Sequence, residues 1–180
     1  RNGSRFAYHY ARGKLSSDCI FRELLKRGIF PAEARFLDLG CGQGSLFSWL
    51  LAARNLYDKG HWPSDWATPP KPLSLLGYEL MQKDVRQKDV LKRFRAALPP
   101  CGLFLTRVGD KAAGLPYHIC NWVDHAVTFA RGHRLPTLYG RKLAEWIDVL
   151  NNLGFVVEPM PMNEGKPFAN IMLICRVPKA

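Results

Sequence analysis

A short glycine-rich stretch, Asp38-Leu-Gly-Cys-Gly-Gln-Gly44, carries the clearest chemical signal in this sequence. It closes the apolar run Arg35–Leu39 and directly precedes a helical pattern that begins at Ser45. Glycines let the backbone turn tightly and approach a ligand closely, and the first turn of a helix exposes unpaired N–H groups. A strand, an acid, glycines and a helix in that order predict a site for a nucleotide-like ligand rather than an ordinary turn.

The spacing of the glycines narrows the class of ligand. Gly40, Gly42 and Gly44 alternate with other residues, whereas a dinucleotide-binding fold prefers Gly-x-Gly-x-x-Gly. No Gly-Lys-Ser/Thr follows, so a phosphate-binding P-loop is excluded. A second acid, Glu79, lies near the C-terminal end of the next apolar run, Leu73–Leu80.

Strands and helices alternate along the chain. Apolar runs predict strands at 35–39, 73–80 and 103–108, and helical spacing predicts helices after Ser16–Asp18, from Ser45, and over 86–98, 117–130 and a stretch after Thr137. The last two strands, Phe155–Glu158 and Ile171–Arg176, have no helix between them and should pair antiparallel. This order predicts an α/β fold, a three-layer sandwich with a mostly parallel sheet and an antiparallel C-terminal strand pair.

One domain over residues 1–180 is expected from this length. Within it, residues 1–34 are expected to form an N-terminal cap with the first helix, and residues 35–180 the cofactor-binding core. A proline-rich stretch at 55–72 should be a long surface loop inserted into that core. Its Trp62 and Trp66 could form a lid over a substrate or pack on the body of the domain.

The composition argues against several classes of protein. No apolar run reaches the roughly 18 residues of a membrane span, and we expect no leader peptide at the polar N-terminus. Five cysteines without a Cys-x-x-Cys pair argue against a disulfide scaffold or a zinc site and favour the cytoplasm. The net charge of +11 would attract phosphate backbones, acidic membranes or anionic substrates. The charges of its densest basic run, 83–95, are nevertheless expected to form the solvated side of an amphipathic helix.

The ordered combination of motifs resembles the class I S-adenosylmethionine-dependent methyltransferases, which have a Rossmann-like fold. Asp38–Gly44 is similar to motif I of that family, and Glu79 to the acid that closes its second strand. Leu98-Pro-Pro-Cys-Gly-Leu-Phe-Leu105 is similar to the family's leucine, proline, glycine and strand segment. The resemblance covers most of the chain and implies S-adenosyl-L-methionine as the cofactor.

The resemblance also implies roles for individual residues. The backbone of the motif would lie against the amino acid and ribose of the cofactor, at Gly40, Cys41, Gly42, Gln43 and Gly44. Asp38 would fix the turn or reach the cofactor's amino group through water. Glu79 would accept hydrogen bonds from both ribose hydroxyls, which the paired oxygens of a carboxylate suit.

The same resemblance exposes a shortage of chain after Glu79. The family's fold needs a helix, two further strands and another helix between the second strand and the helix at Arg86–Leu98. Ordinary strand, helix and loop sizes give about 35 to 45 residues for that segment. We therefore expect such a segment to be absent near Gln82–Arg86, which would leave the sheet without its central strand.

Residues that could bind or activate a methyl acceptor are few. Methyl transfer depends mainly on positioning, and many such enzymes need only a general base or none. The candidates for catalysis are His118, His125 and Asp110, and those for substrate binding are Tyr8, Tyr10 and Trp122. Each histidine could equally be an ordinary surface or core residue. Two histidines without further ligands at suitable spacing do not make a metal site, so no metal is expected.

The leading interpretation is methyl transfer to a small molecule, because the compact core leaves little room for a separate recognition domain. An RNA acceptor is the alternative that the basic surface suggests, although no Asn-Pro-Pro-Tyr-like tetrad or catalytic cysteine motif is visible. A non-catalytic binding module with the same fold is a third interpretation, against which the glycines and Glu79 count. No membrane partner is expected, and the sequence predicts no particular oligomeric state.

Overall fold

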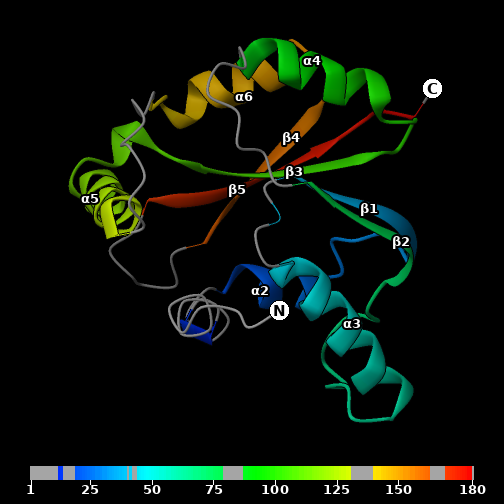
Figure 1. The fold of residues 1–180 in the computed structure, drawn as a ribbon. Helices are drawn as coiled ribbons and strands as arrows, with labels where there is room; N and C mark the ends of the chain where they lie inside the picture. Colours follow the sequence, from blue (N-terminus) through cyan, green and yellow to red (C-terminus); the bar gives the residue numbers. More distant parts are fainter. Residues whose placement is uncertain are drawn as a thin grey trace. The chain divides into compact units, whose positions relative to one another are not determined.

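The computed structural model describes residues 12–13, 19–39, 41, 44–78, 87–130, 140–162 and 169–179. The chain divides into two compact units, Arg1–Asp84 and Val85–Ala180 (Figure 1). Each unit has a strand pairing and a hydrophobic core of its own. Among the described residues, no helix combines the length and the apolar character needed to cross a bilayer.

The first unit is built on two parallel strands, β1 (Glu33–Leu39) and β2 (Lys71–Tyr78). Helix α3 (Ser45–Asp58) connects them, and helix α2 (Ile20–Lys26) precedes β1. Parallel strands need a crossover connection of this kind, so the predicted strand–helix–strand order is confirmed here. Because the strands run in the same direction, their C-terminal ends lie at the same edge of the pair.

Large apolar side chains from both helices and both strands form the core of the first unit. Leu25 of α2 and Leu50 and Ala53 of α3 are its buried members. Around them pack Phe30, Phe36, Leu46, Phe47, Trp49, Trp62, Trp66 and Leu75. Members of α3 recur at helical spacing, so this helix is held along one face and its first turn has a defined position after β1.

The opposite face of the two parallel strands carries exposed apolar side chains. Leu37 and Leu76 are cross-strand partners and both are exposed, although parallel sheets normally bury both faces. In the described residues, β1 pairs only with β2. An uncovered face and an unpaired edge agree with the expectation that elements are absent near Gln82–Arg86. That segment itself lies outside the described residues, and its absence stays a prediction.

The proline-rich stretch after α3 packs on the body of the first unit. It runs from 59 to 70 and is therefore shorter than expected, because α3 extends to Asp58 and β2 begins at Lys71. The Trp62 and Trp66 rings stack edge to face with centroids 5.3 Å apart, and Trp62 Nε1 donates to Ala67 O at 3.0 Å. Both rings join the core, which favours the packing role over the lid.

The second unit is a three-stranded antiparallel sheet in the order β3-β5-β4. Its strands are β3 (Leu103–Gly109), β4 (Val156–Pro161) and β5 (Asn170–Arg176). Its helices are α4 (Gln87–Ala97), α5 (Leu115–Ala130) and α6 (Leu143–Asn151), with a short 3-10 helix, η1 (Lys111–Ala113). The predicted antiparallel pair at the C-terminus is confirmed, and β3 pairs with the other edge of β5.

Helices α4 and α6 cover one face of this sheet (Figure 1). The core between the helices and the sheet contains Leu91, Val108, Trp146, Leu150, Phe155, Leu173, Cys175 and Val177. The central strand β5 is buried along most of its length, and three of its successive residues, Leu173, Ile174 and Cys175, are fully buried. Burial of alternate residues on both faces explains why β5 is an almost continuous apolar run in the sequence.

Because Cys175 is buried, the protein should lose stability as the pH becomes alkaline. Desolvation raises the pKa of this thiol from 9.0 to about 12. The unfolded chain therefore ionises Cys175 above pH 9, whereas the folded chain keeps the thiol neutral, and stability is lost as pH rises from 9 towards 12. The loss from this one group should approach about 1.4 kcal/mol per pH unit.

We expect Cys175→Ala to flatten the fall in unfolding free energy that urea titrations measure between about pH 9 and 11. Cys101→Ala serves as the control, because Cys101 is an exposed free thiol. If the unfolding free energy of Cys175→Ala falls with pH as steeply as that of the wild type and of Cys101→Ala, the buried thiol does not cause the loss of stability.

Candidate functional site

The turn between β1 and α3 depends on the backbone conformation of Gly44. Its φ of +72° and ψ of +34° lie in the left-handed region, which β-branched and bulky residues rarely adopt. The Gly44 N–H donates to Cys41 O at 2.8 Å, and Gly44 O accepts from Ser48 N at 3.0 Å. Gly44 thus closes a tight turn on one side and begins α3 on the other.

The turn approaches the C-terminal end of β2 closely, and Gly77 makes this possible. A Cβ atom at Gly77 would lie 2.8 Å from Cys41 Sγ and 3.2 Å from Phe47 Cε2. No side chain could enter there unless Cys41 and Phe47 moved. Gly77 was not among the predicted site residues. Its only signal in the sequence is a glycine inside an apolar strand pattern, which marks a close approach of backbone and neighbour.

The described members of the predicted cofactor motif lie at one edge of the strand pair. Asp38 is half-buried and pairs in register with Gly77, and Leu39 pairs with Tyr78, the last residue of β2. Cys41 and Gly44 follow directly in the turn. Four further predicted members lie outside the described residues: Gly40, Gly42, Gln43 and Glu79.

The first turn of α3 offers hydrogen-bond donors beside this edge. The first N–H groups of an α-helix have no partner within the helix, and Gly44 has no side chain with which to cap them. The first turn of α3 also contains no acidic residue. Backbone donors at the positive end of the helix dipole can bind an electronegative group of a ligand.

Asp110, a predicted catalytic candidate, is held by backbone hydrogen bonds at the C-terminal end of β3. Its Oδ1 accepts from Ala112 N at 2.9 Å and from Leu143 N at 3.0 Å. Its backbone also forms an isolated bridge with Arg141. These bonds tie the end of β3 to η1 and to the first turn of α6. They give Asp110 a structural task, and its action as a base stays a prediction.

The other described candidates lie on α5. His118 is exposed and His125 half-buried, and both lie on one side of the helix because two turns separate them. Trp122 is exposed. Tyr8 and Tyr10, the two predicted substrate-binding tyrosines, lie outside the described residues. In the described part of the chain, no group of three histidine, cysteine, aspartate or glutamate side chains could hold a metal ion.

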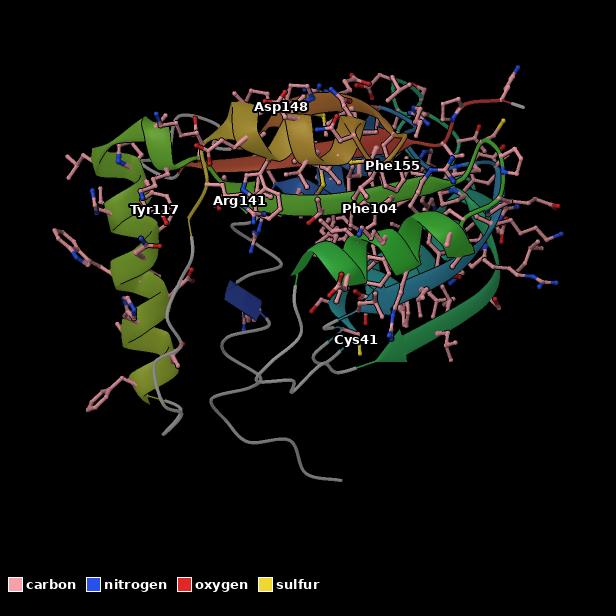
Figure 2. All side chains as sticks on the ribbon, turned by 90° about the horizontal axis from the view of Figure 1, so that it is seen from above. Cys41, Phe104, Tyr117, Arg141, Asp148 and Phe155 are labelled. Atoms are coloured by element: carbon pink, nitrogen blue, oxygen red, sulfur yellow. The ribbon has the colours of Figure 1, made fainter. Side chains whose placement is uncertain are left out.

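The start of α5 is anchored by Tyr117, which sequence reasoning did not single out. Tyr117 is buried, and Figure 2 shows it on the side of α5 that faces Arg141. A Cβ atom added at Gly109 would lie 3.5 Å from the Tyr117 ring, and one added at Gly140 would collide with the Tyr117 hydroxyl. Two glycines thus make room for one aromatic ring and fix α5 next to the C-terminal end of β3.

Comparison with known proteins gives similarity in structure but not in sequence. No family model matches the chain, and no curated protein matches its sequence. A chain of the complex between the Haloferax volcanii Trm112 methyltransferase activator and a putative methyltransferase superposes with a TM-score of 0.60. The two chains are 13% identical, and the match covers 97% of this chain and 95% of that chain.

Two further solved structures are similar. An O-methyltransferase family protein from Burkholderia thailandensis has a TM-score of 0.57 at 14% identity, over 97% of this chain and 59% of that one. Magnesium protoporphyrin IX methyltransferase from Synechocystis PCC 6803, with bound SAH, has a TM-score of 0.50 at 13% identity, over 98% and 90% of the two chains. The chain therefore has the α/β fold of the class I methyltransferases.

Proposed function

We propose that this chain, which has a class I methyltransferase fold, binds S-adenosyl-L-methionine at the turn between β1 and α3 and transfers its methyl group. The contact of Cys41 with Gly77, together with the left-handed Gly44, carries the proposal. It sets a tight turn and a helix N-terminus at the C-terminal ends of two parallel strands, where open α/β sheets bind their ligands. The similar Synechocystis enzyme with bound SAH supports this class of ligand.

The proposed cofactor contacts divide between backbone and side chains. Backbone groups of residues 40–44 would lie against the amino acid and ribose of the cofactor, and Asp38 would fix the turn. Glu79 comes directly after Tyr78, the last residue of β2. Its carboxylate would accept hydrogen bonds from both ribose hydroxyls. Gly77 joins this set as the residue that admits the turn, since a side chain there would displace Cys41.

The proposed reaction moves one methyl group from a sulfonium to an acceptor. The acceptor's lone pair forms a bond to the methyl carbon while the carbon–sulfur bond breaks, and S-adenosylhomocysteine leaves. A protonated acceptor then releases its proton to water or to a base. His118, His125 and Asp110 are the candidates for such a base, and Trp122, Tyr8 and Tyr10 the candidates for acceptor contacts. Most of the rate gain would come from alignment of the two reactants.

A small molecule is the proposed acceptor. RNA is the second candidate, which the net charge of +11 favours. Binding to RNA that weakens steeply as salt rises, together with methyl transfer to that RNA, would support the second candidate. The similar Haloferax structure, which is a complex with a methyltransferase activator, supports a protein partner as a further candidate.

Titration calorimetry with S-adenosylmethionine and with S-adenosylhomocysteine tests the proposed cofactor. We expect both to bind with a Kd of about 30 μM or tighter, which corresponds to about −6 kcal/mol. NAD and ATP are the matched controls and should give no heat of binding, because the glycine spacing fits neither a dinucleotide fold nor a P-loop. Tighter binding of NAD than of S-adenosylmethionine, or no binding of either sulfur compound, would refute the proposal.

A further inference from the structure

Helix α5 presents a row of apolar side chains to solvent. Leu115 and Trp122 are each 66% exposed, and Phe129 is 78% exposed. Ile119 and Ala126 lie between them, so the five residues follow one another at alternating intervals of four and three. At 3.6 residues per turn, such intervals keep all five side chains on one side of the helix. We call these five residues the α5 seam.

The opposite side of α5 packs against the rest of the second unit. Tyr117 is buried there against Gly109 and Gly140, and Cys120 Sγ accepts a hydrogen bond from Ala169 N at 3.4 Å. An ordinary surface helix turns its apolar side to the core and its polar side to water. Since α5 is attached by its other side, the exposed seam is a large apolar patch of the kind that marks an interaction surface.

The intervals of the seam are those of a coiled coil, in which apolar residues recur every three and four positions. The seam is also complementary to itself. If two copies of α5 pair antiparallel about a two-fold axis at Trp122, Leu115 of one copy meets Phe129 of the other. Trp122 then meets its own counterpart, and Ile119, three residues before Trp122, lies within one residue's rise of Ala126, four residues after it. Such a pairing sets a small side chain opposite a larger one beside the central rings, which lets the two rows interdigitate. The same five residues serve both copies, as an isologous interface requires.

The residues beside the seam favour a second copy of this chain, rather than a lipid surface, as the partner that covers it. The positions that flank it are Pro116, His118, Val123 and His125, and none carries a permanent charge. Within α5 itself, therefore, two copies of a chain with a net charge of +11 would face no lysine or arginine across the seam. Helices that bind lipid surfaces carry lysine and arginine beside their apolar side. The sequence of α5 contains neither.

The area of the seam agrees with a reversible dimer. Large aromatic residues bury about 150–250 Å² each, so seam contacts would bury on the order of 500 Å² per copy, or about 1,000 Å² in all. Specific interfaces bury about 1,200–2,000 Å², and weak ones less. We propose that two copies of this chain associate through the α5 seam, antiparallel and with micromolar affinity. The proposal does not rest on the cofactor site, but it removes Trp122 from the candidates for acceptor contacts, because this ring would face its own counterpart in the dimer.

Sedimentation velocity over protein concentrations from about 1 to 200 μM tests the association, a range that brackets micromolar affinity. We expect the wild type to change from monomer to dimer across this range. Trp122→Asp should weaken the dimer at least tenfold, because it would bury two carboxylates against each other. Asp124→Ala is the matched control on the opposite side of α5, and its dimer should equal that of the wild type. Far-UV circular dichroism of both variants checks the fold.

Cross-linking tests the antiparallel geometry. In a Cys101→Ala background, which removes an exposed thiol, Trp122→Cys should form a covalent dimer under mild oxidation. Asp124→Cys should not, because its side chain points away from the two-fold axis. A monomeric wild type at 200 μM, or a dimer that Trp122→Asp leaves intact, would overturn the proposal. So would equal cross-linking of the two cysteine variants, or binding of the monomer to anionic vesicles through Trp122.

Discussion

A Gly44→Val variant is expected to bind S-adenosylmethionine about 10- to 100-fold more weakly than the wild type. Valine in the left-handed region costs about 1–3 kcal/mol, and the turn can relieve this strain only by a change of backbone conformation. That change would break the bond from Gly44 N to Cys41 O and move the first donors of α3. Loss of one or two backbone contacts to the ligand, at about 1.5 kcal/mol each, gives the expected factor.

Gly60→Val is the matched control for this experiment. Gly60 lies just after the C-terminal end of α3, and its φ of +72° is the same as that of Gly44. A Cβ at Gly60 would meet nothing within 4 Å, and one at Gly44 only Phe47 Cδ2 at 4.0 Å. The two variants therefore place valine at the same left-handed φ at opposite ends of one helix. We expect similar falls in Tm but a loss of binding only in Gly44→Val.

The outcome of this comparison separates local from global effects. Equal loss of binding in both variants would mean that strain anywhere on α3 disturbs the unit, and the turn would lose its special role. Wild-type affinity in Gly44→Val would remove the turn from the cofactor site. The ligand is assigned to the end of α3 that follows β1 only if Gly44→Val loses affinity and Gly60→Val keeps it.

The parts of the fold that were predictable from the sequence are those that depend on local patterns. The strand before the glycines, the tight turn and the start of α3 each follow from a few adjacent residues, because glycine conformation and helical spacing act over short distances. The ends of the strands were less predictable than the presence of the strands. The second strand was expected at 73–80, but β2 spans Lys71–Tyr78, since pairing with β1 rather than apolar content sets its ends.

Contacts between distant residues were not predictable from these patterns. The fit of Cys41 over Gly77 joins residues of two different strand ends. Asp110 accepts a bond from Leu143, which lies far along the chain, and its sequence neighbours give no hint of it. The side of α5 that carries Tyr117 is the buried one, because two glycines far apart in sequence make room for that ring.

The core of the second unit provides the prediction with the largest effect on stability. Leu150 of α6 is 0% exposed and packs among the side chains of α4, β3 and β5. Leu150→Ala is expected to lower the free energy of unfolding by about 2–5 kcal/mol, through lost apolar burial and the cavity that remains. Native domains are stable by only about 5–15 kcal/mol, so the urea midpoint should fall clearly.

Leu51→Ala makes the same chemical change on another helix, α3, at a side chain that is 56% exposed. It removes little buried area, and alanine is at least as good a helix former as leucine, so its unfolding free energy should stay within about 0.5 kcal/mol of the wild type. A similar loss in both variants would show that burial at Leu150 is not what stabilises the unit. Because both substitutions remove the same atoms from a helix, their difference in urea titrations measures what burial of the Leu150 side chain contributes to stability.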